Sequence, residues 1–464
     1  MSTKIAVVGA GPTGLTLALM AQKQGHEVVI YEASQKPDPR PRAVMVHARA
    51  LEILASLDLA KNFINRGLMT PGIDFIRSDG ARFTMDFSSL ETSYAGILNI
   101  PQPEIEEILA TAFLQRGGVI HRNSVVTAFQ QKSQSVMFDV SRDGTTSHIE
   151  ANWLFGCDGA HSTIRNLIGA SFDGDTIDHE YILGEGERKT PGAPDVSSML
   201  ISETGVVSWL PFKDGTVRVA GPGRGVSLNQ IGQHSTDSSE RAIELFYAEQ
   251  NQLIFSPQYL IGRIIRAGLY RVHKRIASNW GYGRVWLAGD AAHLHPPAGG
   301  QALNLGLSDA EAIAMRLTTS SGIGFETYEL ERRPIVKATI EEVSMLPLIA
   351  AMREASSDTE FVKIEKALSL KAHRLSQIDT NFLAGDADCL GNRDDKELKT
   401  GRRLNEKIDL MDAINAPPGW KFASVGEHNY WVHADRHVRK KSPQSDTTFS
   451  ATGILSNKET VSWE

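Results

Sequence analysis

The chain has 464 residues, 41% of them hydrophobic and 22% charged, and its formal net charge is −7. These values are typical of a globular protein of two or three domains, and the negative balance argues against the basic surface that nucleic-acid binding needs. Only two cysteines are present, Cys157 and Cys389. They exclude a disulfide framework and favour a reducing, cytoplasmic location. No uninterrupted apolar run is long enough to span a membrane.

The first stretch, Lys4–Glu32, predicts a strand, a glycine turn, a helix and a second strand that ends on an acid. Gly9 permits the tight turn, Gly11 lets a pyrophosphate approach the backbone, and Gly14 lets the helix pack closely on the strand. The helix N-terminus offers free N–H groups to phosphates. Glu32 lies 18 residues after Gly14, about where a carboxylate binds a ribose. The stretch therefore predicts a dinucleotide site.

A loop rich in proline and arginine follows over residues 33–46 and precedes a helix predicted over His47–Leu59. Arg42, His47 and Arg49 are therefore cationic groups just after the acid strand. Such groups either face a diphosphate or are solvated surface charge.

The next elements alternate between hairpins and helices. Residues 71–87 predict a hairpin, and residues 98–117 predict a short strand that runs into a helix. The strands predicted over 119–154 form a small antiparallel unit. This unit leads to Asp158, in an Asp-Gly pair at the start of another helix, which is a geometry that faces ligands.

Residues 171–222 are rich in short predicted strands separated by Gly, Pro and Asp, and they predict the sheet of a second domain interleaved with the first. Gly283–Ala302 is a second signature, in which an apolar strand ends at a Gly-Asp pair and a loop of His, Pro and Gly follows. The chain is then mostly helical to about residue 376. Residues 377–464 are more polar, and their basic run Arg436–Lys441 is interpreted as solvated.

Three ligand-facing stretches thus lie in one chain: GAGPTG at 9–14, CDGAHSTIR at 157–165 and GDAAHLHPPAGGQALN at 289–304. In this order and spacing they resemble the class A FAD-dependent aromatic hydroxylases, which have the p-hydroxybenzoate hydroxylase fold. The resemblance covers about residues 3–375. PRAVMVHARALEIL, at 41–54, resembles the phenol and polyketide hydroxylase branch of that family.

The resemblance implies an α/β (α+β) fold with a Rossmann-like FAD-binding domain over residues 1–170 and 260–330. A β-sheet substrate domain would occupy 171–259, and a helical segment 331–380. Residues 381–464 would form a C-terminal appendage that looks like a shortened thioredoxin-like domain. This appendage has no CxxC, so no redox role is expected of it.

The same resemblance implies tightly bound, non-covalent FAD. The glycine turn would hold its pyrophosphate, Glu32 its adenosine ribose, and Gln102 and Asp290 its ribityl chain. The family usually has glycine where this chain has Ala302, so the added methyl group bears on how freely the flavin ring moves. The residues expected to contact FAD are Gly9, Gly11, Pro12, Thr13, Gly14, Glu32, Ala33, Arg42, Gln102, Val126, Asp158, Gly289, Asp290, Pro297, Gly300, Ala302, Leu303 and Asn304.

The implied activity is that of a single-component monooxygenase. NAD(P)H, with NADPH favoured, reduces FAD, and O2 then forms a flavin C4a-hydroperoxide that hydroxylates a phenolic or polyketide-like aromatic small molecule. The candidate catalytic residues are Arg42, His47 and Pro296. The candidate substrate-binding residues are Ile201, Trp209 and Pro211. A phenolic substrate needs a base, and Tyr94, Tyr181, His47 and His234 are the candidates for it.

Other interpretations stay open. Baeyer–Villiger insertion or epoxidation on the same fold would use the same residues, and product analysis separates them. A non-oxygenating FAD/NAD(P)H oxidoreductase is a second alternative, and a catalytically silent escort protein is a third. No metal is expected, because the histidines lack the spacing of metal ligands. The expected partners are a small aromatic molecule and O2, without nucleic acid or a membrane span, and a homodimer is compatible with these features.

Overall fold

The structure is a computed structural model. It describes residues 2–37, 44–203, 205–222, 243–244, 246–248, 254–296, 298–317, 324–342 and 345–377, and the strand segments 399–400, 420–425, 428–433, 437–440 and 448–450. The chain divides into two compact units. The first is Met1–Glu311 with Thr339–Gln377, and the second is Ala312–Ala338 with Ile378–Glu464. All three motifs lie in the first unit.

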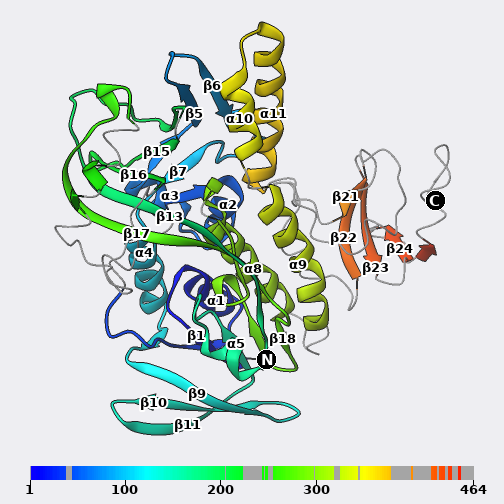
Figure 1. The fold of residues 1–464 in the computed structure, drawn as a ribbon. Coiled ribbons are helices and arrows are strands. Elements are labelled where there is room, and N and C mark those ends of the chain that lie inside the picture. Colours follow the sequence, from blue (N-terminus) through cyan, green and yellow to red (C-terminus); the bar gives the residue numbers. More distant parts are fainter. Residues whose placement is uncertain are drawn as a thin grey trace. The chain divides into compact units, whose positions relative to one another are not determined.

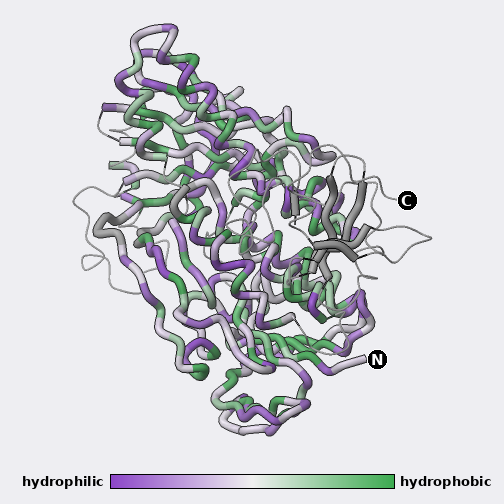
Figure 2. Tube along the Cα trace, turned by 90° about the vertical axis from the view of Figure 1, so that its right-hand side faces the viewer, coloured by the Kyte–Doolittle hydropathy of each residue, from purple (hydrophilic) through white to green (hydrophobic). Residues whose placement is uncertain are grey.

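A six-stranded sheet forms the base of the first unit, in the order β18-β19-β12-β1-β2-β8. Its neighbouring strands pair in parallel except for β18, and β1 is buried along nearly all its length. The strands beside the N-terminus are strongly hydrophobic in Figure 2, as parallel strands covered on both faces must be. In chain order the strands are β1 (Lys4–Val8), β2 (Glu27–Tyr31), β8 (Val119–His121), β12 (Trp153–Gly156), β18 (Gly281–Tyr282) and β19 (Val285–Leu287).

Helix α1 (Pro12–Lys23) follows β1 directly and packs against α4 (Gln102–Gln115). A separate antiparallel sheet is made of β9 (Ser124–Gln131), β10 (Val136–Arg142) and β11 (Thr145–Ala151). It covers less of the chain than the unit expected over 119–154, because β8 and β12 join the parallel sheet instead.

A second sheet of eight strands runs in the order β20-β17-β13-β16-β15-β14-β5-β6. It confirms the interleaving of two sheets. It also extends past residues 171–259 at both ends, because it includes the earlier hairpin β5–β6 and the later strands β17 and β20. In chain order the strands are β5 (Gly72–Arg77), β6 (Arg82–Asp86), β13 (Phe172–Arg188), β14 (Ser197–Ile201), β15 (Val206–Pro211), β16 (Thr216–Pro222), β17 (Ile261–Ala277) and β20 (His293–Leu294).

Shorter elements connect the two sheets. Helices α10 and α11 form a hairpin at the end of the first unit opposite β9–β11 (Figure 1). Ser357 and Glu360 form a capping box at the start of α11, where each satisfies a backbone N–H that helix formation would otherwise leave unpaired. The connecting elements are β3 (Met45–His47), α2 (Ala48–Ser56), α3 (Ala60–Arg66), β4 (Leu68–Thr70), β7 (Ile97–Asn99), α5 (Thr163–Leu167), η1 (Pro257–Tyr259), η2 (Gly289–Ala291), η3 (Ala298–Gly300), α8 (Gln301–Leu317), α10 (Leu346–Glu354) and α11 (Asp358–Ser376).

The second unit contains most of α9 (Phe325–Glu342) and a sheet in which the described strands pair antiparallel. The likeness to a thioredoxin-like domain stays a prediction. The strands are β21 (Lys399–Thr400), β22 (Trp420–Val425), β23 (His428–His433), β24 (His437–Lys440) and β25 (Thr448–Ser450).

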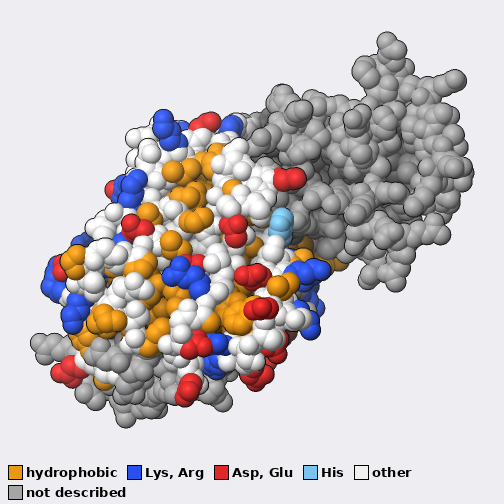
Figure 3. Space-filling view, turned by 90° about the horizontal axis from the view of Figure 1, so that it is seen from above, with side chains coloured by type: hydrophobic (Ala, Val, Ile, Leu, Met, Phe, Trp, Pro, Cys, Tyr) orange, Lys and Arg blue, Asp and Glu red, His pale blue; other side chains and the backbone are white. Residues whose placement is uncertain are grey.

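The helices that the structure describes include none that is both long enough and apolar enough to cross a membrane. On the face shown in Figure 3, the described acidic and basic side chains are interspersed rather than segregated. Such a mixed surface has no single-sign field to attract a polyanion.

Candidate active site

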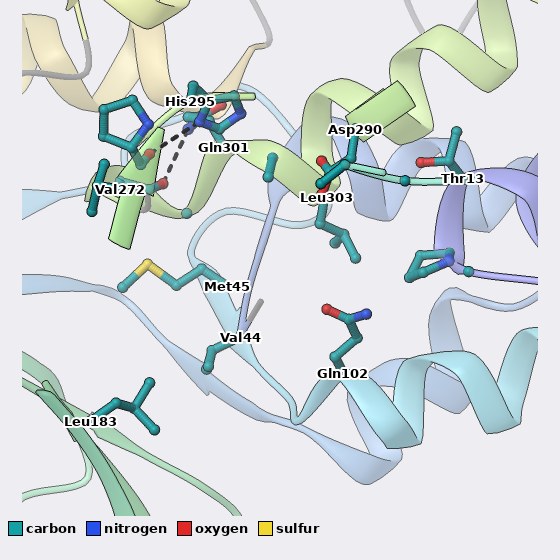
Figure 4. Close-up of a pocket in the computed structure, with 18 of the residues that line it drawn as sticks. Thr13, Val44, Met45, Gln102, Leu183, Val272, Asp290, His295, Gln301 and Leu303 are labelled. Atoms are coloured by element: carbon teal, nitrogen blue, oxygen red, sulfur yellow. Dashed lines mark hydrogen bonds between the residues drawn. The ribbon is translucent and has the colours of Figure 1, made fainter. Parts of the chain in front are cut away.

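One cavity of about 1640 Å³ runs from the carboxyl ends of the parallel strands to the eight-stranded sheet. Figure 4 shows Thr13, Asp290 and Gln102 toward one end of the cavity and Leu183 and Val272 toward the other. Pockets for one small ligand usually occupy about 300–1,000 Å³. The cavity therefore has room for a dinucleotide and a second molecule.

The three glycines of the first turn have different roles. Gly9 has a φ of +103°, and a Cβ on it would lie 2.3 Å from the carbonyl oxygen of Cys157. A Cβ on Gly14 would lie 2.2 Å from the Gly9 oxygen. A Cβ on Gly11 would meet no protein atom within 4 Å, and Gly11 lines the cavity. Gly9 and Gly14 are thus needed for packing, whereas Gly11 leaves room for a ligand.

The N-terminus of α1 opens onto the same part of the cavity. No side chain caps this end, and Pro12 at its first turn lacks an N–H that would need a partner. The remaining first-turn N–H groups and the positive end of the helix dipole favour an anionic ligand such as a pyrophosphate.

The carboxylate of Glu32 is held at the end of β2, facing the glycine turn. Its Oε2 accepts the Ala10 N–H at 2.7 Å, and its Oε1 accepts the Ser34 N–H at 2.7 Å. An ionised carboxylate has about four acceptor positions, so Glu32 keeps capacity for the hydroxyl groups of a ribose. Ala33 and Val126, the latter 1% exposed, line the adjacent wall.

Asp158 organises the second motif by capping α5. Its Oδ2 accepts the backbone N–H groups of Thr163 at 2.7 Å and Ile164 at 3.1 Å, and its Oδ1 accepts the Ser162 hydroxyl at 2.5 Å. Burial raises the pKa of the Asp158 carboxyl, although these hydrogen bonds oppose that shift. Asp158 therefore fixes the turn that borders the cavity.

The third motif forms a loop before α8. Gly299 and Gly300 have φ values of +73° and +65°, and a Cβ on Gly300 would lie 2.7 Å from that of Met45. A Cβ on Gly289 would lie 2.6 Å from Thr13 Oγ1, so Gly289 allows this loop to pack against α1. Ala302 lines the cavity and is partly exposed. The family's glycine would leave that space open.

Two buried side chains, those of His47 and Asn304, form hydrogen bonds to this loop. The Asn304 amide donates to the carbonyl oxygens of Met45 at 3.0 Å and Gly300 at 2.6 Å. The His47 ring donates from Nε2 to the Gly299 oxygen at 2.7 Å, and burial lowers the pKa of His47 to about 4. The ring is 0% exposed and is not part of the cavity wall. This geometry favours a role for His47 in positioning the loop over direct contact with substrate.

The two histidines of the motif also bond to protein groups. His293 Nε2 lies 2.7 Å from Asp309 Oδ2, which also accepts the Gly289 N–H at 3.0 Å. His295 donates from Nδ1 to the Pro296 oxygen at 3.0 Å, and burial lowers the pKa of His295 to about 4. His295 and Pro296 line the cavity.

The part of the cavity farther from the glycine turn is lined by alternate residues of the eight-stranded sheet. Ser208 and Leu210 line the cavity, whereas Trp209 is 0% exposed on the other face, where its indole N–H donates to the Pro194 oxygen. Pro211 shares the face of Trp209. The expected contacts of Trp209 and Pro211 with substrate are therefore corrected, because successive strand residues face opposite ways. Ile201 pairs with Arg77 and is not part of the lining.

The structure brings most of the expected cofactor residues to one cavity. Gly14, Gly289 and Asn304 instead lie behind the lining and support it. Arg42, Pro297 and His234 lie outside the described residues. The expected residues that line the cavity are Gly9, Gly11, Pro12, Thr13, Glu32, Ala33, Gln102, Val126, Asp158, Asp290, Pro296, Gly300, Ala302 and Leu303.

Several lining residues are absent from the sequence-based prediction. Phe75 comes from the β5–β6 hairpin. Met345 and Ile349 come from the start of the α10–α11 hairpin. The strands expected over 171–222 do contribute to the lining, with Leu210 of β15 and its cross-strand partner Arg218 of β16. No local sequence pattern predicts that Met345 and Ile349 line the cavity.

The comparisons with known proteins agree with this geometry. A family model described as FAD binding domain matches residues 2–343. The chain is 33% identical over 409 residues to the rifampicin monooxygenase of Rhodococcus hoagii, covering 84% of this chain and 81% of the relative. It is 32% identical to the para-nitrophenol 4-monooxygenase of Pseudomonas sp. (strain WBC-3), covering 71% and 83%. The anhydrotetracycline hydroxylase OxyS from Streptomyces rimosus superposes with a TM-score of 0.67 at 25% identity, covering 96% and 97%.

Fold and site together define a flavin-dependent oxygenase with interleaved cofactor and substrate sheets. The chain belongs to the FAD binding domain family, among the class A FAD-dependent aromatic hydroxylases. The residues present fit FAD, because Gly11 leaves an open cradle beside an uncapped helix N-terminus and Glu32 faces it. FAD is thus the cofactor.

Proposed function

We propose that the protein hydroxylates a phenolic or polyketide-like aromatic compound with O2 and NAD(P)H, and that NADPH is its preferred reductant. The observation that carries the substrate class is a large cavity that continues past the FAD-binding motifs onto a largely apolar sheet face. Met199, Leu210 and Ala220 provide that face, and flat apolar rings suit such a wall.

The chain's own residues bind and orient the two molecules. The glycine turn and α1 would hold the pyrophosphate of FAD, and Glu32 would hold its adenosine ribose. The positive end of the α8 dipole would favour negative charge on a group bound next to it. Bound FAD supplies the redox chemistry, which takes two electrons from NAD(P)H and delivers one oxygen atom of O2 to the substrate and the other to water.

The reductant is proposed to bind only transiently. The glycine fingerprint at 9–14 is assigned to FAD in this proposal, and Glu32 is assigned to the FAD ribose. Buried lining residues, including Met45 and Leu303, would exclude bulk water from the cavity.

Proton transfer from a phenolic substrate needs a nearby proton acceptor. Tyr181 lines the cavity from β13, whereas the His47 side chain is buried and bonds to the Gly299 oxygen. Among the candidate bases that the structure describes, Tyr181 is therefore the one we place in the proton path. Tyr181→Phe is expected to lower the rate of product formation more than it lowers FAD content.

A substrate screen tests the proposal. Phenols and multi-ring aromatic compounds are added to the yellow holoprotein with NADPH or NADH, and NAD(P)H oxidation is followed with mass spectrometry of the products. We expect at least one such compound to stimulate oxidation and to gain one oxygen atom, labelled when ¹⁸O2 is supplied. Oxidation of NAD(P)H without any oxygenated aromatic product would contradict the hydroxylase assignment.

A further inference from the structure

We propose that Gln377, at the C-terminal end of α11, is a positioning residue for the FAD site. Its side chain fixes the amide of Gln301, which in turn holds the carbonyl group of Gly299 in the loop before α8. A helix far from the glycine turn in sequence thus takes part in setting the affinity for FAD and the reduction equilibrium of bound FAD. This role concerns the cofactor alone and does not depend on which substrate the enzyme oxygenates.

The hydrogen bonds lead from α11 to the loop in one direction. Gln377 Nε2 donates to Gln301 Oε1 at 2.6 Å. Gln301 Nε2 donates to the carbonyl oxygens of Leu375 at 2.9 Å and Gly299 at 3.2 Å, so both hydrogens of this nitrogen are used. If the Gln301 amide were turned over, its oxygen would face two carbonyl oxygens. The donor on Gln377 therefore favours the orientation of Gln301 that holds Gly299.

This network of side chains is closed to water. Gln301 is 0% exposed, Ser308 2% and Gln377 4%. The Ser308 hydroxyl lies 3.1 Å from Gln377 Oε1 and 3.0 Å from the Asn304 oxygen, and its one proton is shared between these acceptors. A buried polar group that loses its partner costs more free energy than the hydrogen bond itself contributes. The orientation of the Gln301 amide is therefore strongly fixed.

The backbone of Gln377 is in the left-handed region, with a φ of +59°. Glycine is the usual residue in this conformation at the end of a helix. The other described non-glycine residues with positive φ, Asp58, Asn123 and Asp143, are exposed and of the types that tolerate it. A strained backbone that persists where the side chain makes buried hydrogen bonds indicates that this side chain is required.

The network ends at the wall of the cavity. Gly299 and Leu375 both line the cavity, and a Cβ on Gly299 would lie 3.1 Å from Leu375 Cδ2. Helix α8 begins at Gln301, and the positive end of its dipole favours negative charge on a group bound next to it. Reduction adds negative charge to a flavin ring. The position of this helix end therefore affects how readily bound FAD is reduced.

A purely stabilising role for the network is the competing explanation, and two substitutions separate it from positioning. Gln377→Gly removes the side chain but relieves the left-handed backbone, so its two effects on stability oppose each other. Gln377→Met keeps the backbone and the approximate size of the side chain but has no amide. Asp58→Gly is the matched control, because it makes the same backbone change at an exposed residue after α2, outside the cavity lining.

Three quantities are measured without substrate. They are the midpoint of thermal unfolding of the apoprotein, the FAD affinity from flavin fluorescence, and the reduction equilibrium of bound FAD against a reference dye of known potential. We expect Gln377→Gly to unfold within about 3 °C of the wild type. Its FAD affinity should fall about tenfold, and its reduction equilibrium should shift about tenfold toward oxidised FAD, or about 30 mV for two electrons.

Gln377→Met should produce the same two changes in FAD, whereas Asp58→Gly should change each by less than about twofold. A reduction equilibrium within about twofold of the wild type in both Gln377 variants would overturn the proposal, whatever the unfolding midpoint. Equal shifts in Gln377→Gly and Asp58→Gly would also overturn it, because the effect would then follow the backbone rather than the side chain.

Ser308→Ala reaches the same network without changing Gln377 itself. It removes the hydroxyl that donates to Gln377 Oε1, in a helix that accepts alanine readily. We expect FAD affinity and the reduction equilibrium to change in the same direction as in Gln377→Gly, by about threefold. Where the Gln377 variants yield no folded protein, this variant decides the matter, and a reduction equilibrium identical to that of the wild type contradicts the positioning role.

Discussion

Asn304 holds His47 across 257 positions of the sequence: the His47 backbone N–H donates to Asn304 Oδ1 at 2.9 Å. The amide nitrogen of the same side chain donates to the carbonyl oxygens of Met45 and Gly300. Asn304 is 1% exposed. One buried carboxamide thus ties strand β3 to the loop that begins α8, and both elements border the FAD-binding cavity.

Asn304→Ala is expected to lower the free energy of unfolding by about 3 kcal/mol, because it removes three hydrogen bonds to backbone groups in a largely buried environment. FAD affinity should fall as well, since the loop loses its support. Urea unfolding and FAD titration of the apoprotein measure the two effects. Asn62→Ala, at an exposed position of α3, is the control and should change stability by less than about 0.5 kcal/mol. A loss below about 1 kcal/mol in Asn304→Ala would show that water replaces these contacts.

The glycine turn gives a pair of opposite predictions. Gly11→Ala should leave the stability of the apoprotein within about 0.5 kcal/mol, because the new methyl group meets no protein atom. It should weaken FAD binding about tenfold or more, because the methyl group fills the space through which the pyrophosphate approaches.

Gly14→Ala should do the reverse. Its methyl group would lie 2.2 Å from the Gly9 oxygen, so we expect the apoprotein to lose about 2–3 kcal/mol. Thermal unfolding of both apoproteins, with FAD affinity from flavin fluorescence, distinguishes the two. If Gly11→Ala destabilised the apoprotein as much as Gly14→Ala does, the separation of ligand space from packing space would be refuted.

The cofactor half of the site is predictable from sequence because its parts are local. Gly11, Glu32 and the helix between them lie within one βαβ unit, where chain connectivity alone brings them together. The Asp158 and Asp290 motifs are likewise ends of strands in the same parallel sheet, and such ends converge on one edge. The family resemblance of these motifs is confirmed by the match over residues 2–343.

The substrate half is less predictable because it depends on register and on distant contacts. Trp209 and Leu210 are neighbours in sequence, yet one is in the core and the other in the cavity, so an error of one residue reverses the assignment. Met345 and Ile349 reach the cavity only through the packing of a helical hairpin far along the chain. His47 carries a type of side chain that suits catalysis, but tertiary structure uses it to hold Gly299.

Stability should depend on pH through His47. The folded state lowers its pKa to about 4, whereas an unfolded histidine titrates near 6.5. Between these values the unfolded chain binds more protons, so stability is lost as the pH falls through this range. His47 alone should make the protein about 2 kcal/mol less stable at pH 5 than at pH 7.5.

His47→Gln isolates this contribution, because glutamine keeps a donor for the Gly299 oxygen but does not titrate. The variant should show a smaller loss of stability between pH 7.5 and pH 5 than the wild type, by about 2 kcal/mol. Chemical unfolding at the two pH values measures it. An identical pH dependence in both proteins would mean that His47 is protonated, or freed from burial, before the molecule unfolds.

Arg77 hydrogen-bonds to the C-terminal end of α10, a helix that contributes to the wall of the cavity. Its Nη1 donates to the carbonyl oxygens of Met352 at 2.9 Å and Ala355 at 2.7 Å, at the C-terminal end of α10, while its Nε donates to Asp79 at 2.8 Å. A cation at a helix C-terminus satisfies carbonyl groups that the helix cannot. Ile349, on the same helix, lines the cavity.

Arg77→Ala should therefore loosen α10 without disturbing the cofactor motifs. Amide hydrogen exchange over residues 346–354 should accelerate about fivefold or more, corresponding to about 1 kcal/mol of lost local stability. The KM for the aromatic substrate should rise, while FAD affinity stays within about twofold. Arg82→Ala is the matched control, because Arg82 lies in the same hairpin, is exposed, and forms a 3.7 Å ion pair with Asp74. Equal effects of the two substitutions on exchange in α10 would show that the hairpin as a whole, rather than the Arg77 contact, holds the helix in place.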